Sequence, residues 1–253
     1  SSDLKAADLM AANNVLVHVP DINDFVEGFK VLLEPHGVVT FEFPHLLQLI
    51  QHNQFDTIYH EHFSYISLLV AERVLARHGL VLFDVEELPT HGGSLRIFGR
   101  HAADEARAVT PAVHALRARE IEAGLDGDEV YRRFSAQVVE TKRSVLEFLI
   151  QAKRAGKTVV GYGAPAKGNT LLNYCGVKSD MIDFTVDRSP HKQGLLLPGT
   201  RIPIRHPDAI LEARPDYLFI LPWNLRDEIV EQMQAIRGWG GQFVVPIPRI
   251  EVF

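Results

Sequence analysis

The chain has 253 residues, of which 46% are hydrophobic and 23% are charged, as in ordinary soluble globular proteins. This length allows two domains of usual size. The net charge of −6 argues against broad binding to nucleic acids or anionic membranes. The single cysteine, Cys175, excludes an internal disulfide and a cysteine-rich zinc site. No stretch has the length of a membrane helix or the pattern of a signal peptide, so we expect a cytoplasmic protein.

The first hundred residues alternate between strand and helix patterns. Residues 8–13 predict a buried strand that starts almost at the first residue. Domains seldom open in this way without earlier strands, so we expect this chain to be the back part of a longer protein. Asp21 is a good N-cap for a helix with Phe25 and Phe29 on one face, and residues 38–43 form the next strand.

The next elements complete the predicted first half. Residues 45–52 predict a short helix, and Ser67 caps a second helix that ends at Gly79. Two neighbouring strands follow at 80–85 and 94–98. This order predicts an α/β fold with an antiparallel finish.

The rest of the chain divides into a helical part and a second α/β part. Residues 101–156 contain two helix patterns and no strand pattern, which predicts a helical linker. From residue 157 onwards strands alternate with helices, which predicts a parallel, doubly wound Rossmann-like sheet. We therefore divide the chain into domains 1–100, 101–156 and 157–253.

The densest group of proton-transferring side chains is the sequence YHEHFSY, residues 59–65. It holds Tyr59, Glu61 and His62 among its two imidazoles, one carboxylate and two phenols. An exposed loop with chance histidines is the alternative interpretation. We favour a catalytic loop between two helices.

Other polar residues follow the predicted strands of the first half. Asn13, Asn14 and His18 come after the first strand, so the fold should bring them to the cleft that receives the YHEHFSY loop. A purely structural histidine at position 18 is an equally good interpretation. We expect the segment His91, Gly92, Gly93 and Ser94 to add amides and a hydroxyl to the same opening.

In the second half, a glycine-rich turn at residues 161–168 separates a strand from a helix. Its amides and the helix N-terminus face an anion in many folds, and Lys167 adds a positive charge. The spacing matches neither GxGxxG nor a Walker A loop, so a structural turn is the alternative. Asp187 is a candidate to bind a ribose hydroxyl. Trp223 and Asn224, which follow a later strand, are further candidates for substrate binding. The candidate substrate-binding residues of the turn are Gly161, Gly163, Ala164 and Lys167.

These motifs together resemble a known family. Residues 13–21 resemble the segment after the fourth strand of class I S-adenosylmethionine (SAM) methyltransferases. The segments 59–63, 91–96 and 161–167, in that order, resemble the sugar C-methyltransferases. That family methylates C-3 of deoxysugars linked to a nucleoside diphosphate, in antibiotic and polysaccharide pathways. The resemblance covers essentially the whole chain.

The resemblance implies a fold, a cofactor and site residues. Residues 1–100 would be the C-terminal part of a class I methyltransferase sheet, and 157–253 a nucleotide-sugar-binding domain. Family members also carry a zinc-binding segment and a glycine-rich SAM loop, which are absent from this sequence. SAM is the expected cofactor, with Asn13, Asn14 and His18 near it, and no metal ligand is expected within this chain.

The implied reaction begins with removal of the C-3 proton next to a 4-keto group. His62 is our choice for the base, and Glu61 orients it or acts in its place. Tyr59 and His18 would donate hydrogen bonds to the developing oxyanion. The resemblance supports these four as active-site positions, whereas the division of roles is our hypothesis.

Three alternatives remain open at this stage. The first is a nucleotide-sugar-binding fragment without activity of its own. The second is a nucleotide-sugar oxidoreductase built on the glycine-rich turn. The third is a metal-dependent hydrolase that uses His60, Glu61 and His62, although no HExxH helix is present. The sequence does not identify the sugar, the nucleotide base or the oligomeric state.

Overall fold

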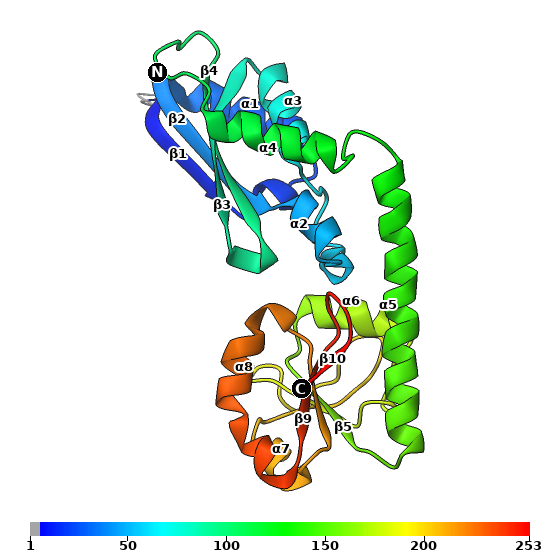
Figure 1. Ribbon diagram of the computed structural model, residues 1–253. Coiled ribbons are helices and arrows are strands. Elements are labelled where there is room, and N and C mark those ends of the chain that lie inside the picture. Colours follow the sequence, from blue (N-terminus) through cyan, green and yellow to red (C-terminus); the bar gives the residue numbers. More distant parts are fainter. Residues whose placement is uncertain (1–5) are drawn as a thin grey trace. The chain divides into compact units, whose positions relative to one another are not determined.

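A computed structural model describes residues 6–253 (Figure 1). By their contacts these residues form two compact units, each described here by itself. The first unit contains residues 1–51 and 60–133, and the second contains residues 52–59 and 134–253. The predicted linker, residues 101–156, is therefore divided between the two units, and the short segment 52–59 groups with the second unit. The described part has no helix that is both long and apolar enough to cross a membrane.

The first unit is built on a four-stranded sheet with the order β1-β2-β4-β3. β1 pairs in parallel with β2, whereas β4 is antiparallel to both β2 and β3, which confirms the predicted antiparallel finish. The helices begin and end close to the predicted positions. The elements are β1 (Ala7–Asn13), α1 (Ile22–Leu32), β2 (Leu33–Pro44), α2 (Leu46–Gln51), α3 (Leu68–Arg77), β3 (Leu80–Leu88), β4 (Ser94–His101) and α4 (Pro111–Glu122).

One prediction about this sheet was wrong. The first strand is present, but it lies at the edge of the sheet and Ala12 is its one buried residue. Leu9 is 67% exposed. A run of hydrophobic residues indicates a buried strand. Burial also depends on whether the strand has neighbours on both sides, and the order of strands in the sheet cannot be read from the local sequence.

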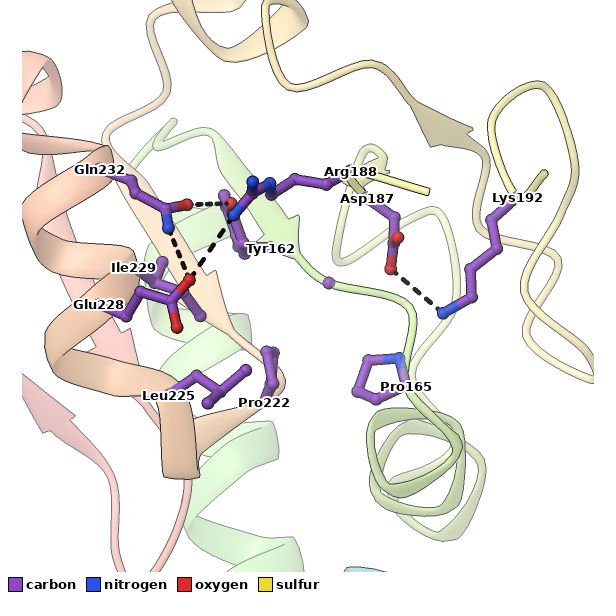
Figure 2. Close-up of a pocket in the computed structure, with 11 residues that line it drawn as sticks. Tyr162, Pro165, Asp187, Arg188, Lys192, Pro222, Leu225, Glu228, Ile229 and Gln232 are labelled. Atoms are coloured by element: carbon purple, nitrogen blue, oxygen red, sulfur yellow. Dashed lines mark hydrogen bonds and ion pairs between the residues drawn. The ribbon is translucent and has the colours of Figure 1, made fainter. Parts of the chain in front are cut away.

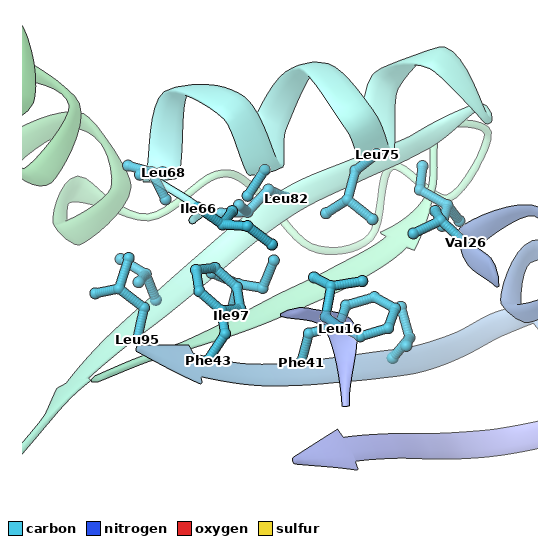
Figure 3. Packing of buried hydrophobic residues seen from close by; sticks show 14 of the residues in the cluster. Leu16, Val26, Phe41, Phe43, Ile66, Leu68, Leu75, Leu82, Leu95 and Ile97 are labelled. Atoms are coloured by element: carbon cyan, nitrogen blue, oxygen red, sulfur yellow. The ribbon is translucent and has the colours of Figure 1, made fainter. Parts of the chain in front are cut away.

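A single hydrophobic core lies between this sheet and its helices (Figure 3). Phe41 and Phe43 of β2 and Ile97 of β4 point toward Leu68 and Leu75 of α3, and all five are almost completely buried. The α3 helix forms where predicted because Ser67 accepts the Val70 amide hydrogen and Gly79 adopts a positive φ of 70° at its end. This packing fixes the C-terminal end of the YHEHFSY loop, where Ile66 and Leu68 enter the core.

The second unit is built on a six-stranded sheet with the order β10-β9-β8-β5-β6-β7. Five strands are parallel as predicted, and β10 is an additional antiparallel edge strand. The elements are α5 (Glu129–Arg154), β5 (Val159–Tyr162), α6 (Ala166–Cys175), β6 (Thr185–Val186), β7 (Ile204–Arg205), α7 (Ala209–Ala213), β8 (Tyr217–Ile220), α8 (Arg226–Gln232), β9 (Gln242–Val245) and β10 (Glu251–Val252).

Both faces of the second sheet are covered. Alternate residues of the central strands enter two separate cores. Val159 and Phe219 join the core with helices α5 and α6, whereas Val160 and Leu218 join the core with α7 and α8. From β5 the chain passes first to β6 and later to β8 on its other side, so a topological switch point lies between β5 and β8.

A buried carboxylate connects α4 to the start of α3 in the first unit. Glu120 is 0% exposed, and its two oxygens accept the amide hydrogens of Leu68 and Leu69 at 2.7 and 2.9 Å. His45 Nε2 lies 2.7 Å from the same carboxylate. Helix amides in the first turn have no partner within the helix, so Glu120 supplies one from another element.

We expect Glu120→Ala to lower the free energy of unfolding of the first unit by about 3–5 kcal/mol, because it leaves His45 and two helix amides buried without a partner. Urea unfolding followed by circular dichroism measures this change. Glu122→Ala, two residues away and exposed, is the matched control and should change stability by less than about 0.5 kcal/mol. Equal stabilities of the two variants would contradict the role given to Glu120.

Candidate functional site

The YHEHFSY loop is held against the turn that follows β1. The backbone amides of Phe63 and Ser64 both donate to the Val17 carbonyl, at 2.8 and 3.4 Å. In return, His18 Nδ1 donates to the Glu61 carbonyl at 2.8 Å. Three hydrogen bonds therefore connect two segments more than 40 residues apart, as the strand-end argument predicted.

His18 and His62 come together in this arrangement. Their ring centroids lie 4.9 Å apart at an interplanar angle of 50°, and Tyr65 meets the His62 ring edge-on at 6.0 Å. A carbonyl oxygen can only accept, so His18 Nδ1 carries a proton and Nε2 is the ring nitrogen left for another partner. His62 is half-buried, whereas the side chains of His18 and Glu61 are exposed.

The other predicted residues of the first unit lie nearby in sequence but differ in surroundings. Asn13 ends β1, and Asn14 has a φ of 55° and donates its amide hydrogen to the Glu42 carbonyl. The Asn13 side chain is exposed and that of Asn14 half-buried. Tyr59 belongs to the segment 52–59, which groups with the second unit. His18 and His62 therefore lie together within the first unit, whereas Tyr59 lies in the segment that groups with the second unit.

The HGGS segment forms a tight hairpin turn between β3 and β4. Gly93 has a φ of 118°, and a Cβ atom there would lie 2.7 Å from Gln48 Cγ, so only glycine fits. The Ser94 hydroxyl donates to the Thr90 carbonyl at 3.0 Å. The Ser94 hydroxyl, which we expected to face the cleft, is therefore bonded within the turn. Gly92 and Ser94 line an open groove of about 520 Å³ with Gln48, and His91 is exposed beside it.

In the second unit, the glycine-rich turn at the end of β5 is not the amide cradle that its sequence indicates. Gly163 donates its amide hydrogen to the Val186 carbonyl, Ala164 donates to Asp187 Oδ2, and Pro165 has no amide hydrogen. Gly163 is required by its φ of 90° and by Pro222, whose Cδ would lie 2.6 Å from a Cβ atom. The amides left for an anion are those at the start of α6.

A cavity of about 230 Å³ opens at the switch point of this sheet (Figure 2). Its position, outside the carboxyl ends of β5 and β8, is where doubly wound sheets bind their ligands. One side is apolar and the rest carries charged and amide groups. The lining residues are Tyr162, Gly163, Pro165, Asp187, Arg188, Lys192, Pro222, Leu225, Glu228, Ile229 and Gln232.

The polar groups of the cavity form two small networks (Figure 2). On one side, the Tyr162 hydroxyl donates to Gln232, which in turn donates to Glu228, and Arg188 lies 3.6 Å from Glu228. Burial raises the pKa of the Tyr162 phenol, which therefore stays protonated as a donor. On the other side, Lys192 Nζ lies 3.4 Å from Asp187 Oδ2.

Asp187 braces the turn. One carboxylate oxygen accepts from the Ala164 amide at 2.8 Å and the other from the Ser189 amide at 2.8 Å. These bonds hold the turn after β5 against the end of β6. Asp187 lines the cavity, but its carboxylate accepts hydrogen bonds from the backbone amides of Ala164 and Ser189 and from Lys192.

Lys167, Trp223 and Asn224 lie together, but they do not line this cavity. Lys167 Nζ donates to Asn224 Oδ1 at 2.8 Å and lies 4.5 Å from the centroid of the Trp223 ring. The Trp223 indole donates to Asp56 Oδ2 at 2.8 Å. Of the predicted substrate-binding set of the second unit, Gly163 and Asp187 line the cavity, and Gly161 and Ala164 do not. Lys167, Trp223 and Asn224 form a separate group with Asp56, called the Asp56 cluster.

Asp56 is a functional candidate that the sequence did not reveal. It is 0% exposed, and burial raises the pKa of its carboxyl group from 3.8 to about 7, although Trp223 and Lys167 both act to lower it. Burial lowers the pKa of Lys167, and the nearby Asp56 opposes this effect. Arg188, Lys192 and Gln232 were missed as well. The sequence gives one indication that these three residues are functional: each lies just after a strand or on the helix that follows a strand.

Metal ligands were also sought. Within residues 6–253, no three His, Cys, Asp or Glu side chains are arranged to hold a metal ion. The hydrolase alternative built on His60, Glu61 and His62 therefore gains no support from the geometry.

We expect the fluorescence of Trp223 to change with pH around a midpoint of about 7, because the bonded Asp56 carboxyl loses its proton there. Trp239→Phe leaves Trp223 as the only tryptophan and allows the titration to be followed by its emission. Adding Asp56→Asn should abolish this transition while the emission maximum stays close to that of the parent. A transition that persists in the double variant would assign the titration to another group.

Comparison with known proteins identifies the chain's relatives. The family model "C-methyltransferase C-terminal domain" matches residues 89–248. The curated C-methyltransferase NovU of Streptomyces niveus is 39% identical over 246 residues, which make up 97% of this chain and 58% of that protein. The chain therefore spans little more than half the length of this relative.

Solved structures give weaker matches. The magnesium protoporphyrin IX methyltransferase of Synechocystis, solved with bound SAH, is 12% identical over 39% of this chain and 48% of that one, with a TM-score of 0.30. An O-methyltransferase family protein of Burkholderia thailandensis is 16% identical over 40% of this chain and 32% of that one, with a TM-score of 0.29. Such low scores carry no argument about the fold.

The family match thus rests on sequence, and it includes the HGGS turn, both helices α4 and α5, and nearly all of the second unit. It covers well over half of the 253 residues. The chain belongs to the C-methyltransferase family defined by this C-terminal domain.

Proposed function

We propose that this chain is the substrate-handling part of a SAM-dependent C-methyltransferase, acting at C-3 of a 4-keto-deoxysugar linked to a nucleoside diphosphate. The observation that carries the proposal is the pairing of His18 with His62 on the YHEHFSY loop, within a chain of the C-methyltransferase family. A carbon nucleophile at C-3 requires a base near neutral pH, and an imidazole has a suitable pKa range.

His62 is the proposed base for the C-3 proton. Loss of this proton moves negative charge onto the 4-keto oxygen, and hydrogen-bond donors aimed at that oxygen stabilise it. His18 fits the donor role in one protonation state. Because Nδ1 is bonded to the Glu61 carbonyl, His18 presents a donor at Nε2 only as the imidazolium. Tyr59 supplies a second donor, and Glu61 orients His62 or replaces it as the base.

The residues of the first unit fit one wall of a cofactor site. Asn13, Asn14 and His18 follow the carboxyl end of β1, and none of these side chains is fully buried. Their amide and imidazole groups are suited to the polar parts of SAM. When bound, SAM supplies the electrophilic methyl group for the C-3 carbon. No glycine-rich loop between a strand and a helix is present among residues 6–133, so this chain alone offers only part of such a site.

The cavity at the β5–β8 switch point is the proposed nucleotide site. At about 230 Å³ it is smaller than the roughly 300–1,000 Å³ typical of ligand pockets, so it suits one ring of a nucleotide sugar. The ion pairs of Arg188 and Lys192, at 3.6 and 3.4 Å, are long. Lys192 also donates to the Ala164 carbonyl at 3.0 Å. Both cations would turn toward the diphosphate, because it is a stronger partner than a screened carboxylate or a carbonyl.

Two alternatives are weighed against this proposal. A nucleotide-sugar oxidoreductase would use the glycine-rich turn to bind a dinucleotide, but the amides of Gly163 and Ala164 are already bonded. A binding fragment without activity shares the nucleotide site and differs only in lacking proton transfer at C-3. The exchange experiment described next separates this alternative from the proposal.

We expect the chain to exchange the C-3 hydrogen of a deoxythymidine-diphosphate-linked 4-keto-deoxysugar with deuterium from D₂O, since proton removal needs no methyl donor. His62→Asn should reduce the rate by about a hundredfold or more. NMR follows the loss of the C-3 proton signal. His60→Asn changes an exposed neighbour in the same loop and should exchange at nearly the parental rate. Normal exchange in His62→Asn would remove that residue from the role of base.

We expect Arg188→Met and Lys192→Met each to weaken the binding of deoxythymidine diphosphate about tenfold, because each removes a charge-assisted contact to phosphate. Calorimetric titration measures the affinity. Lys178→Met, which removes an exposed lysine outside the cavity, should leave it unchanged. If all three variants bind equally well, the nucleotide lies elsewhere.

A further inference from the structure

Residues 52–59 group with the second unit, and the first half of this segment, after His52, is buried. The chain enters it from α2 and leaves it at Tyr59, one residue before it returns to the first unit. Four consecutive side chains are almost inaccessible to solvent, three of them polar. They are Asn53 at 0%, Gln54 at 4%, Phe55 at 5% and Asp56 at 0%. Connecting segments usually lie on the surface, so this burial calls for a specific function.

Two contacts hold the front of the segment. Asn53 adopts a φ of 54° and donates from Nδ2 to Thr141 Oγ1 at 2.6 Å and to the Pro248 carbonyl at 3.1 Å. Phe55 packs edge-on against Tyr174 of α6, with ring centroids 5.3 Å apart. The segment is thereby held by α5, by α6 and by the chain between β9 and β10.

Asp56 holds the rear of the segment, nearest to Tyr59. Its Oδ2 accepts the Trp223 indole hydrogen at 2.8 Å, and its Oδ1 is buried without a hydrogen-bond partner. A buried carboxyl group costs free energy that an apolar residue of similar size would not. What the polar group provides is direction, because an indole N–H bond fixes the position of the carboxyl and of the backbone that carries it.

The position of Asp56 in the chain gives this bond a consequence. Only two residues separate it from Tyr59, and the backbone continues directly into Glu61 and His62. We propose that Asp56 is a positioning residue for the start of the YHEHFSY loop: through its hydrogen bond to Trp223 it fixes the backbone that carries Tyr59, the first residue of the loop. The proposal rests on the proposed function of that loop.

The same geometry separates this role from nucleotide binding. Neither Asp56 nor Trp223 lines the cavity at the switch point. A change at Asp56 should therefore lower the maximal rate of C-3 hydrogen exchange without altering the affinity for the nucleotide. A displacement of about 1 Å in a catalytic group can cost about a hundredfold in rate.

The test compares three variants of this chain in the C-3 exchange assay and in titration with deoxythymidine diphosphate. Asp56→Ala removes the acceptor, and Trp223→Phe removes the donor but keeps an aromatic ring. Both should lose about tenfold or more in maximal rate, with an unchanged nucleotide Kd. Asp56→Asn keeps an oxygen acceptor and should restore most of the rate. Should Asp56→Ala fail to fold, Trp223→Phe decides the question.

The matched control is Asp216→Ala. Asp216 is also a carboxylate of the second unit, bonded to Lys157 and Thr158 before β8. The Asp216→Ala variant should keep the parental rate of C-3 hydrogen exchange. A parental rate in Asp56→Ala or Trp223→Phe would overturn the proposal, and so would an equal loss in Asp216→Ala.

A second measurement keeps the proposal distinct from the proposed function. If the unaltered chain binds the nucleotide but exchanges no hydrogen, the proposed chemistry fails, and amide hydrogen–deuterium exchange then tests Asp56 alone. Asp56→Ala should accelerate exchange at residues 52–66 and leave residues 159–175 protected. Unchanged protection at 52–66 would overturn the positioning role.

Discussion

In each unit, the strands that carry the candidate residues run parallel to a neighbour, and parallel strands deliver their carboxyl ends to one edge of a sheet. In the first unit this constraint places the turn after β1 where the Val17 carbonyl can accept two amides of the YHEHFSY loop. In the second unit it places the ends of β5 and β8 on either side of a cavity. Strand direction therefore determines where both candidate sites lie, and the side chains determine only what each site can bind.

Buried polar groups then determine how the sites are held. Glu120 binds the first amides of α3, Asp187 braces the turn after β5, and Asp56 binds Trp223. Each carboxylate connects elements far apart in sequence through a directional bond. Apolar packing of the same volume would stabilise the fold at lower cost but would leave more freedom in the position of the backbone.

The local parts of this structure could be predicted from sequence. The α3 helix starts after Ser67 and stops at Gly79 because capping depends on a few neighbouring residues. The pairing of His18 with His62 followed from their positions after strand ends. The family was predicted through the resemblance of three motifs, and the family model confirms it.

Properties that depend on distant residues could not be predicted. The exposure of β1 depends on strand order, and the short strand β10 depends on pairing with β9. The turn after β5 has the composition of an anion-binding loop, but Asp187, more than 20 residues later, uses one of its amides. Asp56 looked like an ordinary loop residue, because nothing nearby in the sequence shows that Trp223 and α6 enclose it.

The hydrogen bond from His18 Nδ1 to the Glu61 carbonyl has a consequence for repeated turnover. This bond is made equally by the neutral ring and by the cation, because Nδ1 keeps its proton in both forms. The scaffold beneath His18 therefore stays the same whichever partner Nε2 takes. Under the proposed function, substrate would bind and leave at Nε2 from one turnover to the next without a rearrangement of the loop backbone.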